Sequence, residues 1–177
     1  MQFQYHFAMP DHKTFKIKPI KNFLNKICNT NNKVIIDPFS NRIHGFATYY
    51  NDINPQNKVG FNLDAMDFIK TYPDESIDGV LFDPPYSLRQ LKECYDGIGK
   101  SLTAYETTSY FHDIKDEIFR VLKPGGFVIS FGWHSKGMSK KSRFSKKELM
   151  LIHHGGVHND TIVLHEIKSQ SRLKGVA

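Results

Sequence analysis

The residues most able to do chemistry form one short string, Asp83-Pro84-Pro85-Tyr86, directly after the apolar run 79–82. A short apolar run of this kind predicts a buried strand, and the prolines end it. The carboxylate and the phenol ring should therefore stand at the carboxyl end of a strand, where open α/β sheets bind ligands. Asp83 can accept a hydrogen bond from a planar amine, Pro85 leaves nearby carbonyls free because it donates none, and Tyr86 can stack on a flat ring.

This combination suits the exocyclic amine of a nucleobase, held in place while a methyl group arrives. The alternative explanation is purely structural: a strand that ends in a Pro-Pro turn, with Tyr86 packed against it. Four residues alone do not separate the two explanations, so the surrounding sequence has to be weighed.

The bulk composition is that of an ordinary globular domain. The chain has 177 residues, 40% of them hydrophobic and 24% charged, which is enough for one domain with its own core. Cys28 and Cys94 lack the spacing of a disulfide framework or a zinc site, and no apolar run is long enough to cross a membrane. Residues 1–6 do not resemble a signal peptide, so we expect one cytoplasmic domain over residues 1–177.

The formal charge of +6 favours a polyanionic partner such as DNA. One Ser- and Gly-containing segment with Phe144 in it carries six basic residues: Lys136, Lys140, Lys141, Arg143, Lys146 and Lys147. A flexible basic loop beside a base-holding site is what phosphate neutralisation requires, although a solvated loop has the same composition. A smaller basic cluster near the N-terminus comprises Lys13, Lys16, Lys18 and Lys21.

Apolar periodicity predicts short strands that alternate with helices. The expected strands cover residues 34–36, 47–50, 59–62, 80–82 and 127–131, and a terminal antiparallel hairpin covers 148–153 and 161–167. The expected helices cover residues 20–27, 65–72 and 106–122, the second capped by Asp64. This alternation predicts an α/β fold with a mostly parallel, doubly wound sheet.

Several motifs then follow in a recognisable order: Thr14-Phe15-Lys16-Ile17-Lys18-Pro19 near the N-terminus, Asp37-Pro38-Phe39-Ser40 after the first strand, Asp52 after the second, Asp64 after the third, Asp83-Pro84-Pro85-Tyr86 after the fourth, and Leu122-Lys123-Pro124-Gly125-Gly126 before the fifth. In this order they resemble the S-adenosylmethionine-dependent DNA adenine-N6 methyltransferases, in particular the small phage-type enzymes. The resemblance covers about residues 14–168. It implies a Rossmann-like class I methyltransferase fold, with a mostly parallel seven-stranded sheet and a C-terminal antiparallel hairpin. It also implies a bacterial or phage-encoded protein without a separate target-recognition domain.

The same resemblance implies a role for each motif residue toward S-adenosyl-L-methionine. Asp52, beside Ile53, would accept both ribose hydroxyls, and Asp64, beside Ala65, would accept from the adenine amino group. The methionine end would lie along Asp37, Pro38, Phe39, Ser40 and Asp83, capped by Thr14, Phe15 and Lys18. The structural alternatives are a turn cap for Asp52, a helix cap for Asp64, a core side chain for Phe39 and an exposed Lys18.

Two features depart from the family pattern. The loop after Asp37 usually carries glycines that let the main chain approach the cofactor, but residues 40–44 contain none before Gly45. The distance from Asp37 to the next predicted strand is also too short for a full crossover helix. Ser40 and Asn41 offer side-chain hydrogen bonds in place of the missing glycine contacts.

The expected reaction is direct, in-line methyl transfer to the amine nitrogen, with Asp83 and the Pro84 carbonyl as acceptors and without a metal. We expect Asp83 to orient the amine rather than act as a base, because its ordinary pKa of about 3.9 is far too low. A duplex base reaches such a site only by flipping out, so phosphate contacts must contribute. Besides the basic loop, the expected nucleic-acid contacts are Arg89, Lys92, Lys100, Trp133 and His134.

Other substrates and roles stay open at this stage. Within the enzyme class, the alternatives are cytosine N4 in DNA and an amino group in RNA. A non-catalytic nucleic-acid-binding module with the same fold is the alternative from another class, and the glycine-free loop supports it. Without a recognition domain, we expect relaxed sequence preference or recognition shared across a homodimer. His153, His154 and His158 have no cysteine nearby and favour hairpin packing over a metal site.

Overall fold

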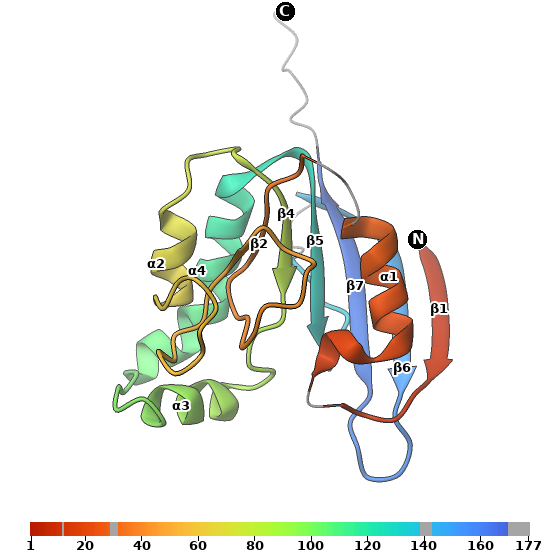
Figure 1. The fold of residues 1–177 in the computed structure, drawn as a ribbon, viewed down its shortest axis with the longest axis horizontal. Helices are drawn as coiled ribbons and strands as arrows, with labels where there is room; N and C mark the ends of the chain where they lie inside the picture. The colour runs from red at the N-terminus through yellow and green to blue at the C-terminus, as the bar shows by residue number, and fades with distance from the viewer. Residues whose placement is uncertain (12, 29–31, 139–142, 170–177) are drawn as a thin grey trace, which may run out of the picture.

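A computed structural model describes residues 1–11, 13–28, 32–138 and 143–169. The strands are β1 (Gln2–Phe7), β2 (Ile35–Asp37), β3 (Tyr49–Tyr50), β4 (Ile77–Phe82), β5 (Leu122–Gly132), β6 (Phe144–His153) and β7 (Thr161–Lys168). The helices are α1 (Lys18–Cys28), α2 (Ala65–Lys70), α3 (Leu88–Asp96) and α4 (Ala104–Val121), and a short 3-10 helix, η1, spans Thr14–Lys16. Helix α1 lies on one face of the sheet, and α2 and α4 lie on the other (Figure 1).

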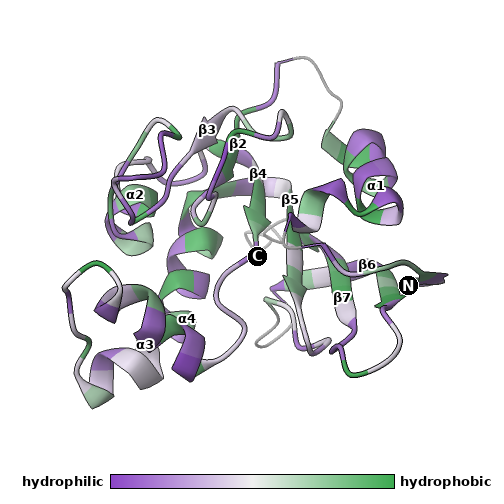
Figure 2. Ribbon diagram, turned by 60° about the horizontal axis from the view of Figure 1, so that its bottom comes forward, coloured by the Kyte–Doolittle hydropathy of each residue, from purple (hydrophilic) through white to green (hydrophobic). Residues whose placement is uncertain are grey.

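Within the described residues the strands form one seven-stranded sheet in the order β1-β6-β7-β5-β4-β2-β3. Neighbouring strands are parallel except at β7, which runs antiparallel to both β5 and β6. The predicted mostly parallel sheet with a C-terminal antiparallel hairpin is therefore confirmed. The carboxyl ends of β4 and β5 lie at the lower edge in Figure 1, and Figure 2 turns this edge toward the reader.

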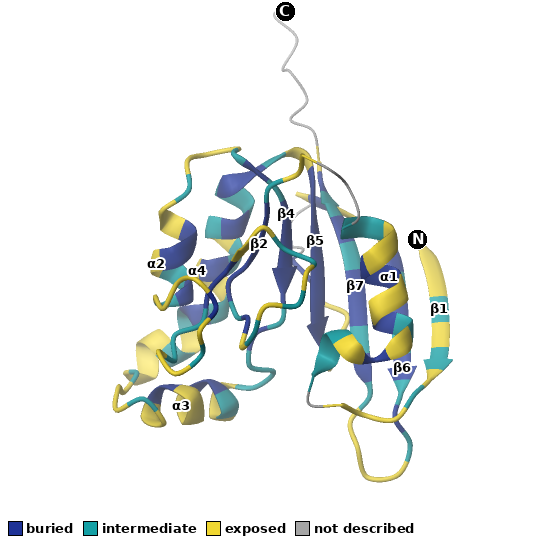
Figure 3. Ribbon diagram, in the orientation of Figure 1, coloured by how far each residue is buried: buried dark blue, intermediate teal, exposed yellow. Residues whose placement is uncertain are grey.

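Successive side chains of the central strands point into two different cores. Val80 in β4 and Val128 in β5 are fully buried with the side chains of α2 and α4. Leu81 and Ile129, one residue further along each strand, are fully buried on the α1 face. Strands covered on both faces have continuous apolar runs, which is why these two were predictable from sequence. Figure 3 shows both strands as buried, with the exposed helix surfaces outside them.

Strand β1 was not predicted, and its physical environment explains why. It pairs in parallel with β6 at the outer edge of the sheet, where Gln4 donates a hydrogen bond to Glu148. Its alternate residues Phe3, Tyr5 and Phe7 are 61, 58 and 63% exposed, so no buried apolar run marks the strand. Pairing with an open strand edge, rather than burial of side chains, holds this segment in the sheet.

The predicted strand 59–62 does not form a ladder. It is reduced to a single parallel bridge between Asn51 and Phe61. The side chain of Asn62 instead donates hydrogen bonds to the carbonyl oxygens of residues 52, 54 and 57. Because side-chain amides hold this loop, the segment needs no second strand partner.

Helix α3 occupies part of the segment 87–105, which we expected to become ordered on the substrate. Ser87 caps it, with its Oγ accepting a hydrogen bond from the Gln90 amide at 3.2 Å. Leu91 and Tyr95 are its buried residues and pack in the core with α4. The helix therefore exists before any ligand binds, and it extends directly from the Asp83-to-Tyr86 string.

Candidate active site

Asp83 lies at the junction of two cavities at the carboxyl edge of the sheet. The first, which we call the α3 cavity, has a volume of about 550 Å³, and the second, the basic cavity, has about 510 Å³. Both are in the size range of small-molecule sites. The residues that line both cavities are Thr14, Phe39, Asn41 and Asp83. A ligand that filled either cavity would therefore end beside the Asp83 carboxylate.

The environment of Asp83 favours its neutral form more than water does. Burial raises the pKa of Asp83 to about 6, and the nearby Asp37 raises it further, while hydrogen bonds from Tyr86 and Thr14 oppose the shift. The Tyr86 hydroxyl donates to Asp83 Oδ1 at 2.6 Å. Burial and the Asp83 charge raise the pKa of Tyr86, so the phenol stays neutral and remains a donor.

The turn that holds Tyr86 is fixed by α3 and by the loop after β5. The Tyr86 amide donates to Gln90 Oε1 at 2.7 Å. The Trp133 ring meets the Tyr86 ring edge-on at 5.5 Å between centroids. Trp133 and His134 line a small pocket of about 100 Å³ together with Pro84, Pro85 and Tyr86. The structure thus brings these five predicted site residues together.

Asp37, at the end of β2, is buried and held by two protein hydrogen bonds. Its Oδ1 accepts from the Phe39 amide at 3.0 Å, and its Oδ2 lies 2.8 Å from His44 Nε2. His44 Nδ1 accepts from the Phe46 amide at 3.2 Å, so Nε2 carries the proton and donates to Asp37. The His44 ring also packs edge-on against Phe15 at 4.5 Å.

His44 was missed by the sequence-based reasoning. The available signal was the loop 40–44, which lacks glycine and is too short for a crossover helix. In the structure, the His44 side chain fills this short loop and fixes the Asp37 carboxylate. Ser40 is buried and turns inward, with its Oγ donating to the Arg42 carbonyl at 2.6 Å. Asn41 accepts from Arg42 Nε at 2.8 Å.

Asp52 and Ile53 line the α3 cavity, as does Ala65 from the start of α2. Asp52 accepts hydrogen bonds from the Asn54 amide at 2.7 Å and from the Asn57 side chain at 2.9 Å. Burial raises the pKa of Asp52, and these two hydrogen bonds oppose the shift. Asp52 therefore caps its turn and also faces the cavity. Each carboxylate oxygen has two lone pairs, so both retain acceptor capacity.

Asp64 combines a helix cap with a contact to α3. Its Oδ1 accepts from the Met66 amide at 2.8 Å, which confirms the predicted cap of the helix. Its Oδ2 accepts from the Tyr95 hydroxyl, and Tyr95 in turn lies 3.1 Å from the Tyr110 hydroxyl. Tyr95 and Tyr110 both line the α3 cavity, beside Ala65. These two tyrosines had no role in the sequence-based prediction.

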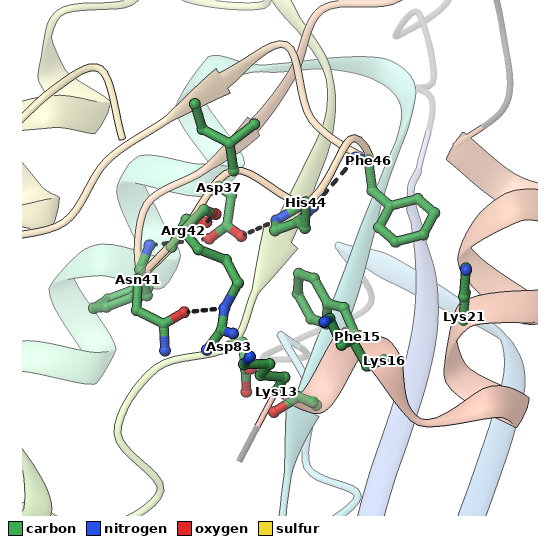
Figure 4. Close-up of a pocket in the computed structure, with 14 residues that line it drawn as sticks. Lys13, Phe15, Lys16, Lys21, Asp37, Asn41, Arg42, His44, Phe46 and Asp83 are labelled. Carbon is green, nitrogen blue, oxygen red and sulfur yellow. Dashed lines mark hydrogen bonds and ion pairs between the residues drawn. The ribbon is translucent and has the colours of Figure 1, made fainter. Parts of the chain in front are cut away.

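The N-terminal motif contributes to both cavities. Thr14 lines each of them, and Phe15 lines the basic cavity, where it packs against Phe131 at 4.9 Å between ring centroids. Phe39 and Pro38 line the α3 cavity from the other side. Lys18 is exposed at the start of α1. The cations that line the basic cavity are Lys13, Lys16, Lys21 and Arg42 (Figure 4).

The predicted basic loop is divided by the fold. Lys136 is exposed in the turn after β5, whereas Lys146 and Lys147 belong to strand β6. Lys140 and Lys141 lie outside the described residues. Arg143 precedes β6, whose first residue pairs with Lys168 at the end of β7, and Lys168 donates to the carbonyl of Leu122, the first residue of β5. Because Asp83 follows the last residue of β4, Arg143 lies at the opposite edge of the sheet.

Several of these basic side chains already have protein partners. Arg143 pairs with Asp116 at 3.4 Å and lies over the Phe119 ring at 4.7 Å. Lys146 Nζ donates to the Ser135 carbonyl at 2.7 Å. On α3, Arg89 pairs with Glu93 at 2.7 Å. Lys92 and Lys100 are exposed on and just after the same helix. Their roles toward nucleic acid stay predictions.

The histidines near the β6–β7 loop are bound to protein groups. His153 lies 2.9 Å from Asp160, and buried His154 contacts the Ala8 carbonyl and the Thr161 hydroxyl. Across the described ranges, no cluster of three or more His, Cys, Asp or Glu side chains is arranged to hold a metal ion. None of the helices in those ranges is long and apolar enough to span a membrane.

Comparisons with known proteins follow from this geometry. No protein-family model matches the chain. The chain is similar to the type II methyltransferase M.BamHI of Bacillus amyloliquefaciens, with 30% identity over 106 residues, covering 60% of this chain and 24% of that protein. It is also 30% identical over 89 residues to the type II methyltransferase M.PvuII of Proteus hauseri, covering 49% of this chain and 25% of that protein. The chain thus spans about a quarter of the length of these curated relatives.

Solved structures with the same architecture are methyltransferases of low sequence identity. An rRNA methylase from Streptococcus thermophilus has a TM-score of 0.52 and 15% identity, covering 92% of this chain and 100% of that one. A 1,6-didemethyltoxoflavin-N1-methyltransferase from Burkholderia thailandensis, solved with S-adenosylhomocysteine, has a TM-score of 0.54 and 12% identity, covering 86% and 78%. The predicted Rossmann-like class I methyltransferase fold is confirmed. Fold and curated relatives together support a methyltransferase.

Proposed function

We propose that this chain is an S-adenosyl-L-methionine-dependent methyltransferase that modifies the exocyclic N6 amine of adenine in DNA. The observation that carries the proposal is the position of Asp83. It stands where two cavities meet, at the carboxyl edge of a methyltransferase-type sheet, with Tyr86 and the two prolines beside it. The basic charge of the chain supports a polyanionic substrate.

The α3 cavity fits the adenosine part of the cofactor. Its volume of about 550 Å³ is adequate, and it offers a carboxylate acceptor, Asp52, next to the apolar walls of Ile53 and Ala65. Asp52 would hold the ribose hydroxyls, and Asp64 would hold the adenine amine next to Tyr95. The methionine end would extend past Thr14, Pro38, Phe39 and Asp83 toward Phe15, Asp37, Ser40 and Lys18. When bound, the cofactor supplies an electrophilic methyl group on its sulfonium.

The protein's own contribution is to position the target amine. Asp83 and the main-chain carbonyl of Pro84 accept the two amine hydrogens, which localises the nitrogen lone pair toward the methyl group. Before substrate binds, the Tyr86 hydroxyl occupies Asp83 Oδ1 and holds the carboxylate in place. When a base enters, Tyr86 exchanges this hydrogen bond for a stacking contact. Positioning of this kind accounts for most of the expected rate gain.

An adenine has to leave the duplex to reach this site. Flipping costs a few kcal/mol, and one aromatic stack returns about 1–3 kcal/mol. Tyr86 and Trp133, whose rings are in edge-on contact, supply aromatic surface beside the two prolines. Contacts with backbone phosphates supply the remainder. We retain a homodimer and a cytoplasmic location in a bacterial host as further predictions.

Tritiated methyl transfer to DNA and to RNA, followed by nucleoside identification, tests the proposal. We expect label in N6-methyladenosine of DNA. Label in N4-methylcytosine or in RNA would replace the substrate but keep the reaction type. No transfer, together with no saturable heat when S-adenosylhomocysteine is titrated by calorimetry, would instead identify a binding module that keeps the fold.

The pH dependence of the reaction follows from the Asp83 environment. A carboxylate accepts hydrogen bonds from an amine better than a carboxylic acid does, and the pKa of Asp83 is raised by burial to about 6. We therefore expect kcat/KM to fall about tenfold per pH unit below pH 6 and to stay level above it. Initial rates from pH 5 to pH 8 measure this profile. A profile that stays flat to pH 5 would contradict the assigned role.

Asp52→Ala should weaken cofactor binding without abolishing it. Hydrogen bonds to a charged acceptor contribute about 1.5–3 kcal/mol, so we expect Kd for S-adenosylhomocysteine to rise about 10- to 100-fold. Calorimetry measures this change. Because Asp52 also accepts from the Asn54 amide, Asp52→Asn serves as the control that keeps one acceptor for the turn. Equal affinities for wild type and Asp52→Ala would remove Asp52 from the cofactor site.

A further inference from the structure

The basic cavity is lined by four cationic side chains that come from two separate segments. Lys13, Lys16 and Lys21 belong to the N-terminal segment around η1 and the start of α1, and Arg42 belongs to the loop after β2. Figure 4 shows Lys21 and Arg42 on opposite sides of the cavity, with Phe15 between them. The fold therefore gathers positive charge around a hollow that reaches Asp83.

No carboxylate among the described residues forms an ion pair with these four cations. Arg42 Nε donates to the Asn41 amide oxygen, which is a neutral acceptor. Elsewhere in the described chain, cations with a carboxylate partner include Arg89, Arg120, Lys123, Arg143 and Lys168. Positive charge is thus left uncompensated at the basic cavity, whereas it is compensated at many other surface positions.

The two carboxylates of the cavity do not neutralise it. Asp37 uses its oxygens on the Phe39 amide and on His44, and Asp83 accepts from Tyr86. Even when both are counted as ionised, four cations against two anions leave a formal excess of two positive charges. Like charges around one hollow repel each other unless an anion enters it.

The proposed cofactor does not supply that anion. Its methionine end carries one carboxylate and one ammonium, which cancel, and its sulfonium adds a positive charge. With the cofactor in place, the excess of positive charge at the basic cavity would therefore grow. The missing partner has to be a further anion that binds next to the methyl-transfer centre.

We propose that the basic cavity binds backbone phosphates of the DNA strand that carries the target base. This inference rests on the proposed function, and it assigns the phosphate contacts to a surface different from the segment 136–147. Lysine and arginine are the residues that most often contact phosphate oxygens, and such contacts set the register of the protein on the nucleic acid. The cavity shares Thr14, Asn41 and Asp83 with the α3 cavity. Phosphates held there would present the adjoining nucleotide to Asp83.

The test is the double variant Lys16→Gln/Lys21→Gln, in which both altered side chains are exposed, so the fold should be retained. The control is Lys58→Gln/Lys70→Gln, which removes the same charge from two exposed lysines that do not line the cavity. Fluorescence anisotropy with a labelled DNA duplex and the matching single strand gives Kd at several salt concentrations. Calorimetry gives the affinity of the same proteins for S-adenosylhomocysteine.

We expect the cavity variant to bind DNA roughly 10- to 30-fold more weakly at physiological salt, while its cofactor affinity changes less than about threefold. The slope of log K against log salt should become shallower by about 1.8 on duplex or about 1.4 on single strand, which corresponds to two lost phosphate contacts. The control variant should lose less than half of this slope change.

Two results would overturn the inference. In the first, the cavity variant keeps the wild-type salt slope. In the second, the variant loses about tenfold in affinity for S-adenosylhomocysteine at an unchanged slope, which would assign the lysines to the methionine carboxylate. Either result is distinct from failure of the proposed function, which would appear as wild-type protein that transfers no methyl group to DNA.

Discussion

Replacing Asp83 with alanine should lower methyl transfer on the order of 10³-fold while leaving cofactor affinity within a few-fold of wild type. The carboxylate is the acceptor placed at the junction of both cavities, and no other carboxylate is shared by their linings in the described residues. Removal leaves the amine with only the Pro84 carbonyl as an acceptor, so its lone pair is less well directed. Single-turnover transfer of tritiated methyl groups to DNA measures the loss.

A matched control for Asp83→Ala is Glu93→Ala on α3, where the carboxylate is exposed and pairs only with Arg89 among the described residues. This control should transfer methyl groups at nearly the wild-type rate. Calorimetry with S-adenosylhomocysteine shows whether both variants still bind cofactor. Asp83→Ala that turned over at a rate close to wild type would refute the catalytic assignment.

Asp83→Asn should stabilise the fold at pH 8 by about 1–3 kcal/mol although it impairs catalysis. Burial raises the pKa of Asp83 to about 6, so keeping it ionised above that pH costs free energy in the folded state. In the unfolded chain the same carboxyl titrates near 3.8. Between those two values the folded state binds the extra proton, and stability therefore falls as pH rises through this window. Asparagine has no such dependence.

Thermal denaturation at pH 5 and at pH 8 tests this difference. We expect the variant to melt several degrees above wild type at pH 8, with a smaller difference at pH 5, where wild-type Asp83 is mostly protonated. Asp116→Asn, at an exposed position far from the site, is the control and should show no gain that depends on pH in this way. Equal melting temperatures at pH 8 would mean that the site does not disfavour the charge.

Helix α3 connects the two halves of the site physically. Near its beginning, Gln90 accepts from the Tyr86 amide, and at its end Tyr95 donates to Asp64. The same helix therefore fixes the catalytic turn and the proposed adenine acceptor. A change in the position of α3 would alter both the Tyr86 ring and the α3 cavity together.

The location of the chemistry was decided by local sequence. An apolar run that ends in Asp83-Pro84-Pro85-Tyr86 can only place its carboxylate just beyond a buried strand, because the prolines prevent continuation of the ladder. The same reasoning found Asp37 at the end of β2 and the cap of α2 by Asp64. Strand runs, caps and proline stops depend on neighbours a few residues away, so they can be recognised without tertiary structure.

The partners of these residues were decided only by the fold. His44 reaches Asp37, and Tyr95 reaches Asp64, through contacts that loop packing and the placement of α3 create. The fold also places Arg143 at the far edge of the sheet while it gathers Lys16 and Arg42 around one cavity. Charge counts and motif order carry no information about such meetings, because side chains distant in sequence become neighbours only when sheet order and helix packing bring their backbones together.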